Sequence, residues 1–420
     1  MSTGISPQPQ DEVLKVVIYR PHDNIWFKNP VRNILKKQLL PNKYAPFLDY
    51  LIDSKHKIYF TTKLCVDGGL KNLIKAILEP FELLLWCILN GVSVKRVGFI
   101  FTKNGLVEKD VLILMHYGTF THENSEVAER GAKLAEYLSN LTIFKLVHMT
   151  HFAYNSAIGS QNLKIFKPDL LVAENNLASH SEYYKKYFSK LSGDFYQLPY
   201  IPASRFIVNL PFEDRINKIV VSGSITFRMK DENFKNFFKI DELQPLRRII
   251  YENSHKYPNK ICSLISDVTA SYAAAQSQVQ GGFIVERLRN LLLFKHPQMS
   301  YYKQDIVVAY NSHKMFSVPE EVCNLPAIGF VEGMACGCAF FGLDDPMYRD
   351  IGMIPGEHYV AYDGSLEGLM EAVSYYQINS DKLKNIAENG HRFVMEKLSA
   401  NNVYGNLVAH LNLMINAKNN

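Results

Sequence analysis

The N-terminal half of the chain alternates short apolar, β-branched runs with longer amphipathic stretches, and this alternation limits the possible folds more than any other feature. It is typical of βα units that bury a parallel sheet between layers of helices. Helices are expected over Leu70–Leu89, over Ser125–Leu138 and from about Ser179. The expected strands are Lys15–Tyr19, Lys57–Thr61, Val94–Phe101, Asp110–Met115, Phe144–His148 and Asp169–Ala173. The pattern predicts an α/β fold with a doubly wound sheet.

A similar pattern restarts after the proline-containing segment Leu198–Pro202. Prolines suit neither a central strand nor a helix interior, so a boundary between two units is expected near 205–217. Later strands are expected at Lys218–Ser222, Ile261–Ser266, Asp305–Tyr310 and Ala339–Phe341, and helices at Phe283–Phe294, Leu366–Tyr376 and Asp381–Leu398. We predict a disordered tail at 1–11, a domain at 12–210, a second domain at 211–398, and a helix or tail at 399–420 that can pack back on the first domain.

Length and composition agree with two globular domains. The chain has 420 residues, of which 47% are hydrophobic, enough apolar surface to exclude disorder except at the ends. Residues 1–210 carry seven more basic than acidic residues, but the net charge of the whole chain is only +5. That charge is too small and too spread out for a protein that binds duplex nucleic acid, and it leaves an anionic acceptor or membrane surface as the expected partner.

The cellular location is predicted from signals that the sequence lacks. Residues 1–11 do not have the pattern of a signal peptide, and the longest apolar run, Leu83–Leu89, is too short to cross a bilayer. The six cysteines lack metal-ligand spacing, which indicates buried free thiols in a reducing cytoplasm. The basic, apolar stretch Val31–Lys43 is either a solvated helix face or a peripheral contact with the inner face of a membrane.

The strongest motif is the small-residue stretch Pro326–Gly342. Gly329 precedes a predicted helix whose first turn holds Glu332, and the N–H groups of such a turn attract a phosphate. Glu332 is then placed to accept the hydroxyls of a ribose. The alternative is a tightly packed helix whose acidic residue stabilises its dipole.

The order of several motifs, over roughly residues 140–400, resembles that of GT-B glycosyltransferases. The matching segments are Leu198–Phe206, Lys218–Lys230 with Gly223 and Lys230 in register, His151, Glu332 and 356–360. They are most similar to the large retaining family of glycogen synthases and lipid-carrier mannosyltransferases. The resemblance implies two Rossmann-like domains facing a central cleft, with the acceptor on the N-terminal domain and a nucleotide sugar on the C-terminal one. It also implies that His151 approaches the donor sugar.

Two positions depart from that family, and a second resemblance competes with it. Asn324 stands where the family has its first acid, and Ser224 replaces an arginine, which weakens any assignment of retained stereochemistry. The His-Pro pair at His296 is similar to a motif of GT-B enzymes that transfer Kdo or sialic acid from CMP. In that alternative Asp267 is a cleft carboxylate; otherwise it caps a strand end.

The chemistry of sugar transfer selects the remaining candidates. Charge on the leaving phosphate calls for cations, and Arg228 and Lys230 are the candidates if they are not merely solvated. On the acceptor side, polar residues at or just after expected strand ends are candidates, with Glu174 as either a base or a helix cap. These acceptor-side residues are His116, His148, His151 and Glu174. We expect no metal and no cofactor other than the nucleotide sugar.

The sequence therefore predicts a metal-independent glycosyltransferase that moves a sugar from a nucleotide donor to a glycan or lipid-linked acceptor. The expected process is bacterial surface polysaccharide synthesis, of lipopolysaccharide, O-antigen or capsule. The alternatives are a transferase that uses CMP-Kdo or CMP-sialic acid, a catalytically silent protein that binds sugar nucleotides, and an epimerase of the same fold.

Overall fold

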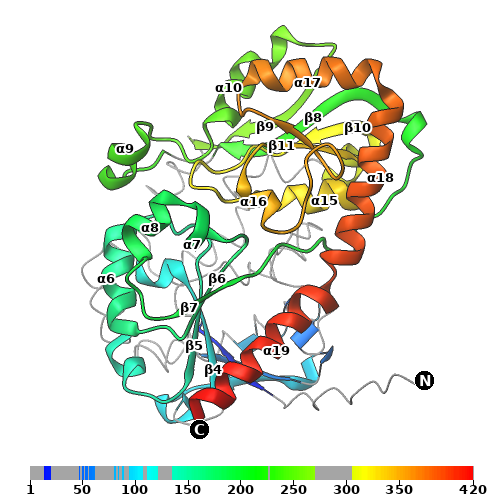
Figure 1. The fold of residues 1–420 in the computed structure, drawn as a ribbon. Helices are drawn as coiled ribbons and strands as arrows, with labels where there is room; N and C mark the ends of the chain where they lie inside the picture. Colours follow the sequence, from blue (N-terminus) through cyan, green and yellow to red (C-terminus); the bar gives the residue numbers. More distant parts are fainter. Residues whose placement is uncertain are drawn as a thin grey trace, which may run out of the picture.

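A computed structural model gives the fold of the chain (Figure 1). It describes residues 14–19, 47, 50, 51, 53, 54, 56–61, 80, 81, 84, 88, 94–106, 111–121, 135–225, 228–269 and 305–419. These residues form two parallel sheets, one above the other in Figure 1, each flanked by helices. The α/β class with two Rossmann-like units is confirmed.

The first sheet has seven described strands in the order β3-β2-β1-β4-β5-β6-β7, and all of its pairs are parallel. Its central strand β4 is buried on both faces, because alternate residues enter two different apolar clusters. The strands are β1 (Lys15–Ile18), β2 (Lys57–Thr61), β3 (Val97–Ile100), β4 (Val111–His116), β5 (Phe144–His148), β6 (Leu170–Ala173) and β7 (Asp194–Gln197). Helices α6 (Ser156–Phe166), α7 (Leu177–His180) and α8 (Glu182–Phe188) flank them. We call this part the N-terminal domain.

The second sheet has the order β12-β11-β10-β8-β9, again with parallel pairs. We call it, with its helices, the C-terminal domain. The strands are β8 (Ile216–Ile225), β9 (Ile261–Asp267), β10 (His313–Ser317), β11 (Ala339–Leu343) and β12 (Val360–Tyr362). The helices are α9 (Glu232–Phe238), α10 (Pro245–Asn253), α14 (Ile306–Ser312), α15 (Gly329–Ala335), α16 (Pro346–Arg349), α17 (Leu366–Ile378) and α18 (Ser380–Lys397).

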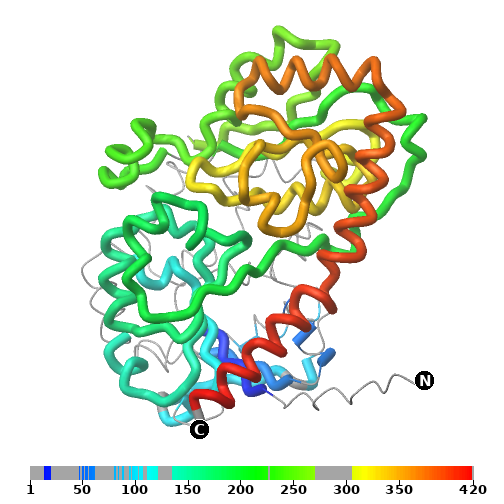
Figure 2. Tube along the Cα trace, in the orientation of Figure 1, coloured from blue at the N-terminus to red at the C-terminus, as the bar shows by residue number. Residues whose placement is uncertain are grey.

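The chain crosses between the domains twice (Figure 2). The first crossing is the segment 198–215, whose buried Leu198, Ile201 and Phe206 join the apolar cores of both domains. The second runs from α18 into α19 (Ala400–Asn419), which returns to the N-terminal domain. There the ring of Tyr404 lies 4.9 Å from that of Phe47, and Lys418 Nζ lies 2.8 Å from an Asp169 oxygen. The last helix therefore ties the two domains together.

Most strand predictions hold, and those for Lys57–Thr61 and Phe144–His148 are confirmed residue for residue. The strand predicted at Asp305–Tyr310 is wrong, because this segment is the start of α14. The Asp305 carboxylate accepts hydrogen bonds from the N–H groups of Val307 and Val308, at 3.1 and 3.2 Å, and this N-cap outweighs the strand preference of the β-branched run. The strand of this region is β10.

Several predictions lie outside the described residues. They are the tail 1–11, the basic stretch Val31–Lys43, the helix Phe283–Phe294 and most of the helices Leu70–Leu89 and Ser125–Leu138. Of the described cysteines, Cys323, Cys336 and Cys338 are buried free thiols and Cys262 is half-buried. Among the described helices, none is both long and apolar enough to cross a membrane.

Candidate active site

Polar side chains gather where the central strands of the N-terminal sheet end. His116 and His148 are the last residues of β4 and β5 and pair in register, and Glu174 directly follows β6. Carboxyl ends of parallel strands form one edge of a sheet, which is where α/β folds bind ligands. All three residues are almost fully buried, with exposed fractions of 1–5%.

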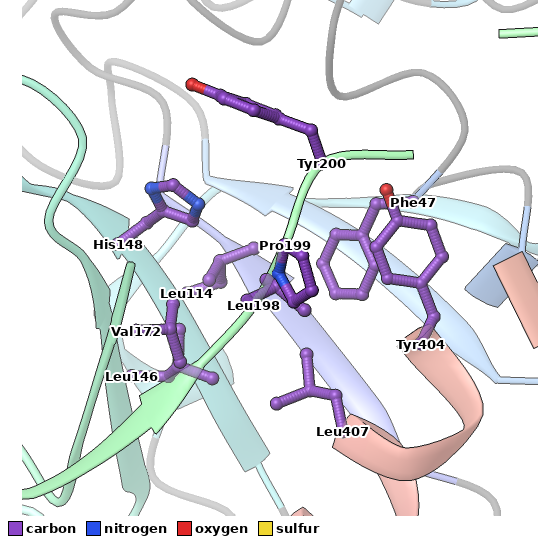
Figure 3. Close-up of a pocket in the computed structure, with 10 residues that line it drawn as sticks. All are labelled: Phe47, Leu114, Leu146, His148, Val172, Leu198, Pro199, Tyr200, Tyr404 and Leu407. Atoms are coloured by element: carbon purple, nitrogen blue, oxygen red, sulfur yellow. The ribbon is translucent and has the colours of Figure 1, made fainter. Parts of the chain in front are cut away.

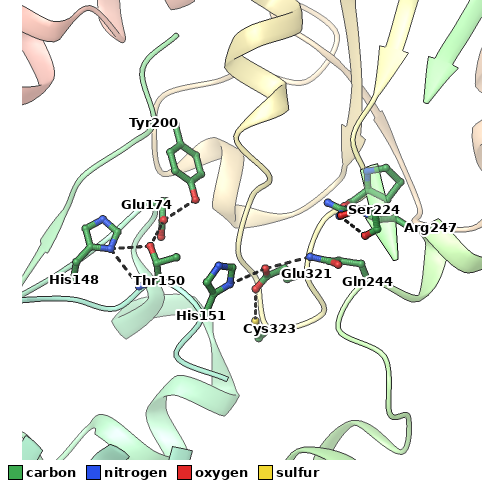
Figure 4. Close-up of polar contacts among 11 residues, drawn as sticks. His148, Thr150, His151, Glu174, Tyr200, Ser224, Gln244, Arg247, Glu321 and Cys323 are labelled. Atoms are coloured by element: carbon green, nitrogen blue, oxygen red, sulfur yellow. Dashed lines mark hydrogen bonds and ion pairs between the residues drawn. The ribbon is translucent and has the colours of Figure 1, made fainter. Parts of the chain in front are cut away.

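Thr150 connects two of these groups (Figure 4). Its hydroxyl oxygen lies 2.7 Å from His148 Nδ1 and donates to Glu174 Oε1 over 2.5 Å. The hydroxyl of Tyr200 donates to the same carboxylate oxygen over 2.7 Å. The Glu174 carboxylate thus lies beneath two hydroxyl groups, and the helix that follows is capped at Asn176 rather than at Glu174.

His116 is oriented by its own turn. Its Nδ1 accepts a hydrogen bond from the N–H of Gly118 over 2.9 Å, so the proton of the neutral ring is on Nε2. Its ring is nearly parallel to that of His148, at 7° and a centroid distance of 6.5 Å. Two imidazoles therefore stand side by side at the edge of the sheet.

A cavity of about 30 Å³ opens beside this group (Figure 3). His148 and Tyr200 are its polar lining residues. The remaining lining is apolar or aromatic: Phe47, Leu114, Leu146, Val172, Leu198, Pro199, Tyr404 and Leu407. The cavity is therefore lined mainly by apolar side chains, with the His148 ring among them.

His151 carries the contacts from this edge to the C-terminal domain. Its Nδ1 lies 3.4 Å from Glu321 Oε1, and the same Glu321 oxygen accepts from the side-chain amide of Gln244 over 3.2 Å (Figure 4). The backbone of His151 has a φ of 60°, a left-handed conformation that a residue with a side chain adopts at an energetic cost. The turn that follows β5 therefore places this ring at the domain boundary.

A second set of contacts surrounds Asn324. The retaining glycosyltransferases that the sequence resembles have an acidic residue at this position. The side-chain amide of Asn175 donates to the Asn324 carbonyl over 2.8 Å, and Ser181 Oγ donates to the Cys323 carbonyl over 3.0 Å. The Asn324 amide in turn donates to Asp345 over 2.9 Å. Asn324 is thus a structural connection between the domains.

His180 and Asp350 form a further contact between the two domains. Asp350 accepts from the N–H of Asn176 over 3.2 Å, and its other oxygen lies 2.6 Å from His180 Nε2. Helix α7 therefore contacts the C-terminal domain at both of its ends, through Asn176 and His180.

Glu332 lies in the first turn of α15 and is half-buried. Burial raises the pKa of its carboxyl to about 7, and the guanidinium of Arg205, in the segment between the domains, opposes that rise. Gly329, which begins α15, has no room for a side chain, because a Cβ would lie 2.8 Å from Val318 and 2.9 Å from the Tyr310 hydroxyl. Glu332 thus lies within electrostatic reach of the segment between the domains.

Arg247 is a residue that sequence reasoning missed. It lies on α10, is buried, and donates to the carbonyls of Ser224 and Pro319, both over 3.1 Å. Gly223 has a φ of 154°, and a Cβ there would lie 2.8 Å from Arg247 Nε. The Arg247 guanidinium therefore lies beside Ser224. In the retaining glycosyltransferases that the sequence resembles, the position of Ser224 holds an arginine. No sequence motif indicates the role of Arg247.

The remaining predicted residues of the donor side differ in exposure and in their partners. Arg228 is exposed and lies 3.4 Å from Asp241, and Lys230 is exposed too. Asp267 ends β9. Burial opposes its ionisation, but hydrogen bonds with Thr269 and the ion pair with Arg248 over 3.2 Å lower the pKa of its carboxyl below the usual value. His296 lies outside the described residues. Within the described part of the chain, no cluster of three or more histidine, cysteine or acidic residues could hold a metal ion.

Solved structures match this arrangement over nearly the whole chain. A glycosyltransferase from Rickettsia africae ESF-5 matches with a TM-score of 0.53 and 11% identity, over 96% of this chain and 99% of that one. The chain has the GT-B fold. Sucrose-phosphate synthase from Thermosynechococcus elongatus gives a TM-score of 0.51 at 10% identity, over 96% and 100% of the two chains. HepE from Anabaena, in complex with UDP-glucose, gives 0.50 at 10%, over 95% and 99%.

A family model agrees with the structural neighbours. The model of glycosyl transferase family 90 matches residues 333–413, which run from α15 to the middle of α19. No curated protein matches the chain significantly. The family model and the structural neighbours together support a glycosyltransferase.

Proposed function

We propose that the chain transfers a sugar from a nucleotide-sugar donor to a glycan or lipid-linked acceptor in bacterial surface polysaccharide synthesis. One observation carries the proposal most directly: His151, the residue after Thr150 of the buried polar group on the N-terminal sheet, lies 3.4 Å from Glu321 of the C-terminal domain. A transferase needs this juxtaposition, because the reacting hydroxyl and the donor come from different domains.

The donor is assigned to the C-terminal domain. Gly329 and Glu332 are the candidate nucleotide-binding residues on α15, and Gly223 and Ser224 are those at the end of β8. The solved HepE structures, which contain UDP or UDP-glucose, favour a UDP-sugar as the first donor to test. We expect the negative charge on the leaving phosphate to be met by the chain's own cations, namely Arg228, Lys230 and Arg247.

The acceptor is assigned to the N-terminal domain. The apolar cavity beside His148 favours an acceptor with an apolar portion, as a lipid-linked sugar has. The basic stretch Val31–Lys43 supports a peripheral contact with the inner face of the cytoplasmic membrane, where such acceptors are held.

The first experiment is a thermal-shift panel of UDP, GDP and CMP and of their sugar conjugates. A ligand that binds only the folded protein raises its Tm, by mass action. We expect the largest rise with UDP or a UDP-sugar, and its loss in Glu332→Ala. A rise with CMP alone would favour the Kdo or sialic acid alternative.

The second experiment measures release of the free nucleotide. Release that requires a glycan or lipid-linked acceptor supports a transferase, whereas conversion of the donor sugar without any acceptor supports an epimerase. Binding of the nucleotide with no release under any condition would leave a silent binding protein. The matched control is Glu182→Gln, since this exposed residue lies on α8, away from the contacts described above.

A further inference from the structure

A short turn of the C-terminal domain, residues 321–325, lies against the N-terminal domain. The N–H of Glu321 donates to the carbonyl of Leu325 over 3.1 Å, and the N–H of Asn324 donates to the carbonyl of Glu321 over 3.2 Å. Asn324 has a φ of 65°, a left-handed conformation that asparagine adopts more readily than most residues. We call residues 321–325 the docking loop. Because it follows the carboxyl end of β10, it borders the edge of the C-terminal sheet where an α/β fold binds its ligand.

Two neighbouring carbonyls of the docking loop accept hydrogen bonds from the N-terminal domain. Ser181 Oγ donates to the Cys323 carbonyl over 3.0 Å, and the side-chain amide of Asn175 donates to the Asn324 carbonyl over 2.8 Å. Both donor side chains are fully buried. Asn175 lies in the turn after β6 and Ser181 is the N-cap of α8, so two separate segments of one domain hold a single loop of the other.

The side chains of the docking loop also enter an apolar cluster of the N-terminal domain. Cys323 and Leu325 are 0% and 3% exposed, and they belong to the cluster that strands β4, β5 and β6 form with helices α6 and α8. Apolar residues of the segment 228–243 of the C-terminal domain join the same cluster. The Cys323 thiol lies within electrostatic reach of Tyr183 and Glu174 of the N-terminal domain. The loop is therefore packed into the N-terminal domain as well as hydrogen-bonded to it.

The place of the Glu321 carboxylate depends on this docking (Figure 4). One of its oxygens lies 3.4 Å from His151 Nδ1 and accepts from the Gln244 amide over 3.2 Å. The other oxygen accepts from the Cys323 thiol over 3.5 Å. Because Cys323 is seated in the apolar cluster of the N-terminal domain, a loop that leaves this cluster takes Glu321 away from His151.

We propose that Asn175 and Ser181 are positioning residues, which hold the docking loop against the N-terminal domain and thereby keep Glu321 at the domain boundary. They act through the backbone carbonyls of the loop. The inference rests on the proposed function in one respect, which is that the donor binds beside the loop in its docked state. A donor of this kind stabilises the docking, as any ligand stabilises the state that it binds.

Alkylation of the native protein with iodoacetamide, followed by mass spectrometry of its peptides, measures the docking at Cys323. Burial raises the pKa of the Cys323 thiol, so the reactive thiolate forms when the loop leaves the cluster. Asn175→Ala and Ser181→Ala each remove one hydrogen bond and should speed the labelling of Cys323 about 5-fold. Cys336 and Cys338, which are buried between α15 and β11, are internal controls in the same sample and should keep their wild-type rates.

Ser181→Ala needs a control of its own, because Ser181 Oγ also accepts from the N–H of Tyr184 over 3.3 Å and so caps α8. Ser365→Ala removes the corresponding cap of α17, whose Ser365 Oγ accepts from the N–H of Gly368 over 2.9 Å. This control should leave the labelling of Cys323 at its wild-type rate. Unchanged labelling of Cys323 in Asn175→Ala or in Ser181→Ala would overturn the inference. Equal acceleration of Cys323, Cys336 and Cys338 would overturn it too, since that is the result of a general loss of stability.

The part of the inference that concerns the donor has a separate readout. UDP-glucose, or the sugar nucleotide of the panel that raises Tm most, is added at ten times its Kd and should slow the labelling of Cys323 about 10-fold. A nucleotide that raises Tm and leaves this labelling unchanged would overturn the inference and leave the transferase proposal standing. If no nucleotide raises Tm, the proposed function fails instead, and labelling without ligand still decides whether Asn175 and Ser181 hold the loop.

Discussion

Glu320 provides a test of the electrostatics of the C-terminal domain. It follows β10, is buried, and accepts hydrogen bonds from the Tyr348 hydroxyl over 2.6 Å and from the Leu343 N–H over 3.2 Å. Burial raises the pKa of its carboxyl from 4.5 to about 7, against the opposing effect of these two donors. The folded protein therefore holds this proton at pH values where the unfolded chain has lost it.

The size and sign of the effect follow from that difference. Each pKa unit is worth about 1.4 kcal/mol, so ionisation of Glu320 costs the folded state about 3 kcal/mol. Below pH 4.5 both states are protonated and there is no cost. The free energy of unfolding then falls as the pH rises from 4.5 to about 7. Above about pH 7 the whole cost of ionising Glu320 is present.

The perturbation is Glu320→Gln, which keeps a carbonyl oxygen for both donors and cannot ionise. Urea unfolding should show the variant gaining up to about 3 kcal/mol relative to wild type at pH 8, compared with pH 5. Glu332→Gln should show a smaller effect in the same direction, because Glu332 is only half-buried. The exposed Glu182→Gln should show none. An equal stability difference at pH 5 and pH 8 for Glu320→Gln would refute the reasoning.

Three other changes test the packing and the domain boundary. Gly333→Ala should destabilise the protein by about 1–3 kcal/mol, measured by urea unfolding, because its Cβ would lie 2.3 Å from the buried ring of Phe316. Gly356→Ala has open space, so only its left-handed φ of 78° should cost about 1–2 kcal/mol, and a larger loss would contradict this reading. Asp350→Asn removes the charge beside His180 and should cost about 1 kcal/mol while raising hydrogen exchange at the domain boundary; unchanged exchange would argue against it.

The parallel sheets could be predicted from sequence because each central strand carries its own signal. Leu170–Ala173 is a continuous apolar run, and Phe144–His148 is apolar except for Lys145 and the terminal His148; both strands are buried along their whole length. Edge strands lack that signal, and β7, whose residues are Asp-Phe-Tyr-Gln with none buried, was not predicted. The error at Asp305–Tyr310 has a different origin, since one capping side chain decided between helix and strand.

In the candidate site, too, some residues could be predicted from the sequence and others could not. His116, His148 and Glu174 could be proposed from sequence because the end of a predicted strand is a position that local pattern gives. Thr150 could not be assigned a role, since its importance comes from two partners that lie on different strands. Arg247 was missed for a similar reason, because its contacts join α10 to the ends of two strands that are far from it in sequence.

The contacts between the domains affect how a substrate reaches His148 and Glu174. On one side in Figure 1 the domains are joined by the crossing segment and by α18 and α19, with a shared apolar core. The contacts made by His151, Asn175 and Asp350 are instead polar, and the hydrogen bonds of Asn175 and Asp350 are each worth about 1 kcal/mol. His148 and Glu174 are at most 5% exposed in this arrangement, so a sugar acceptor cannot reach them without movement. The domains can therefore separate at the lowest cost in free energy when the polar contacts break and the apolar core stays intact. Substitutions that weaken the polar contacts should speed substrate exchange.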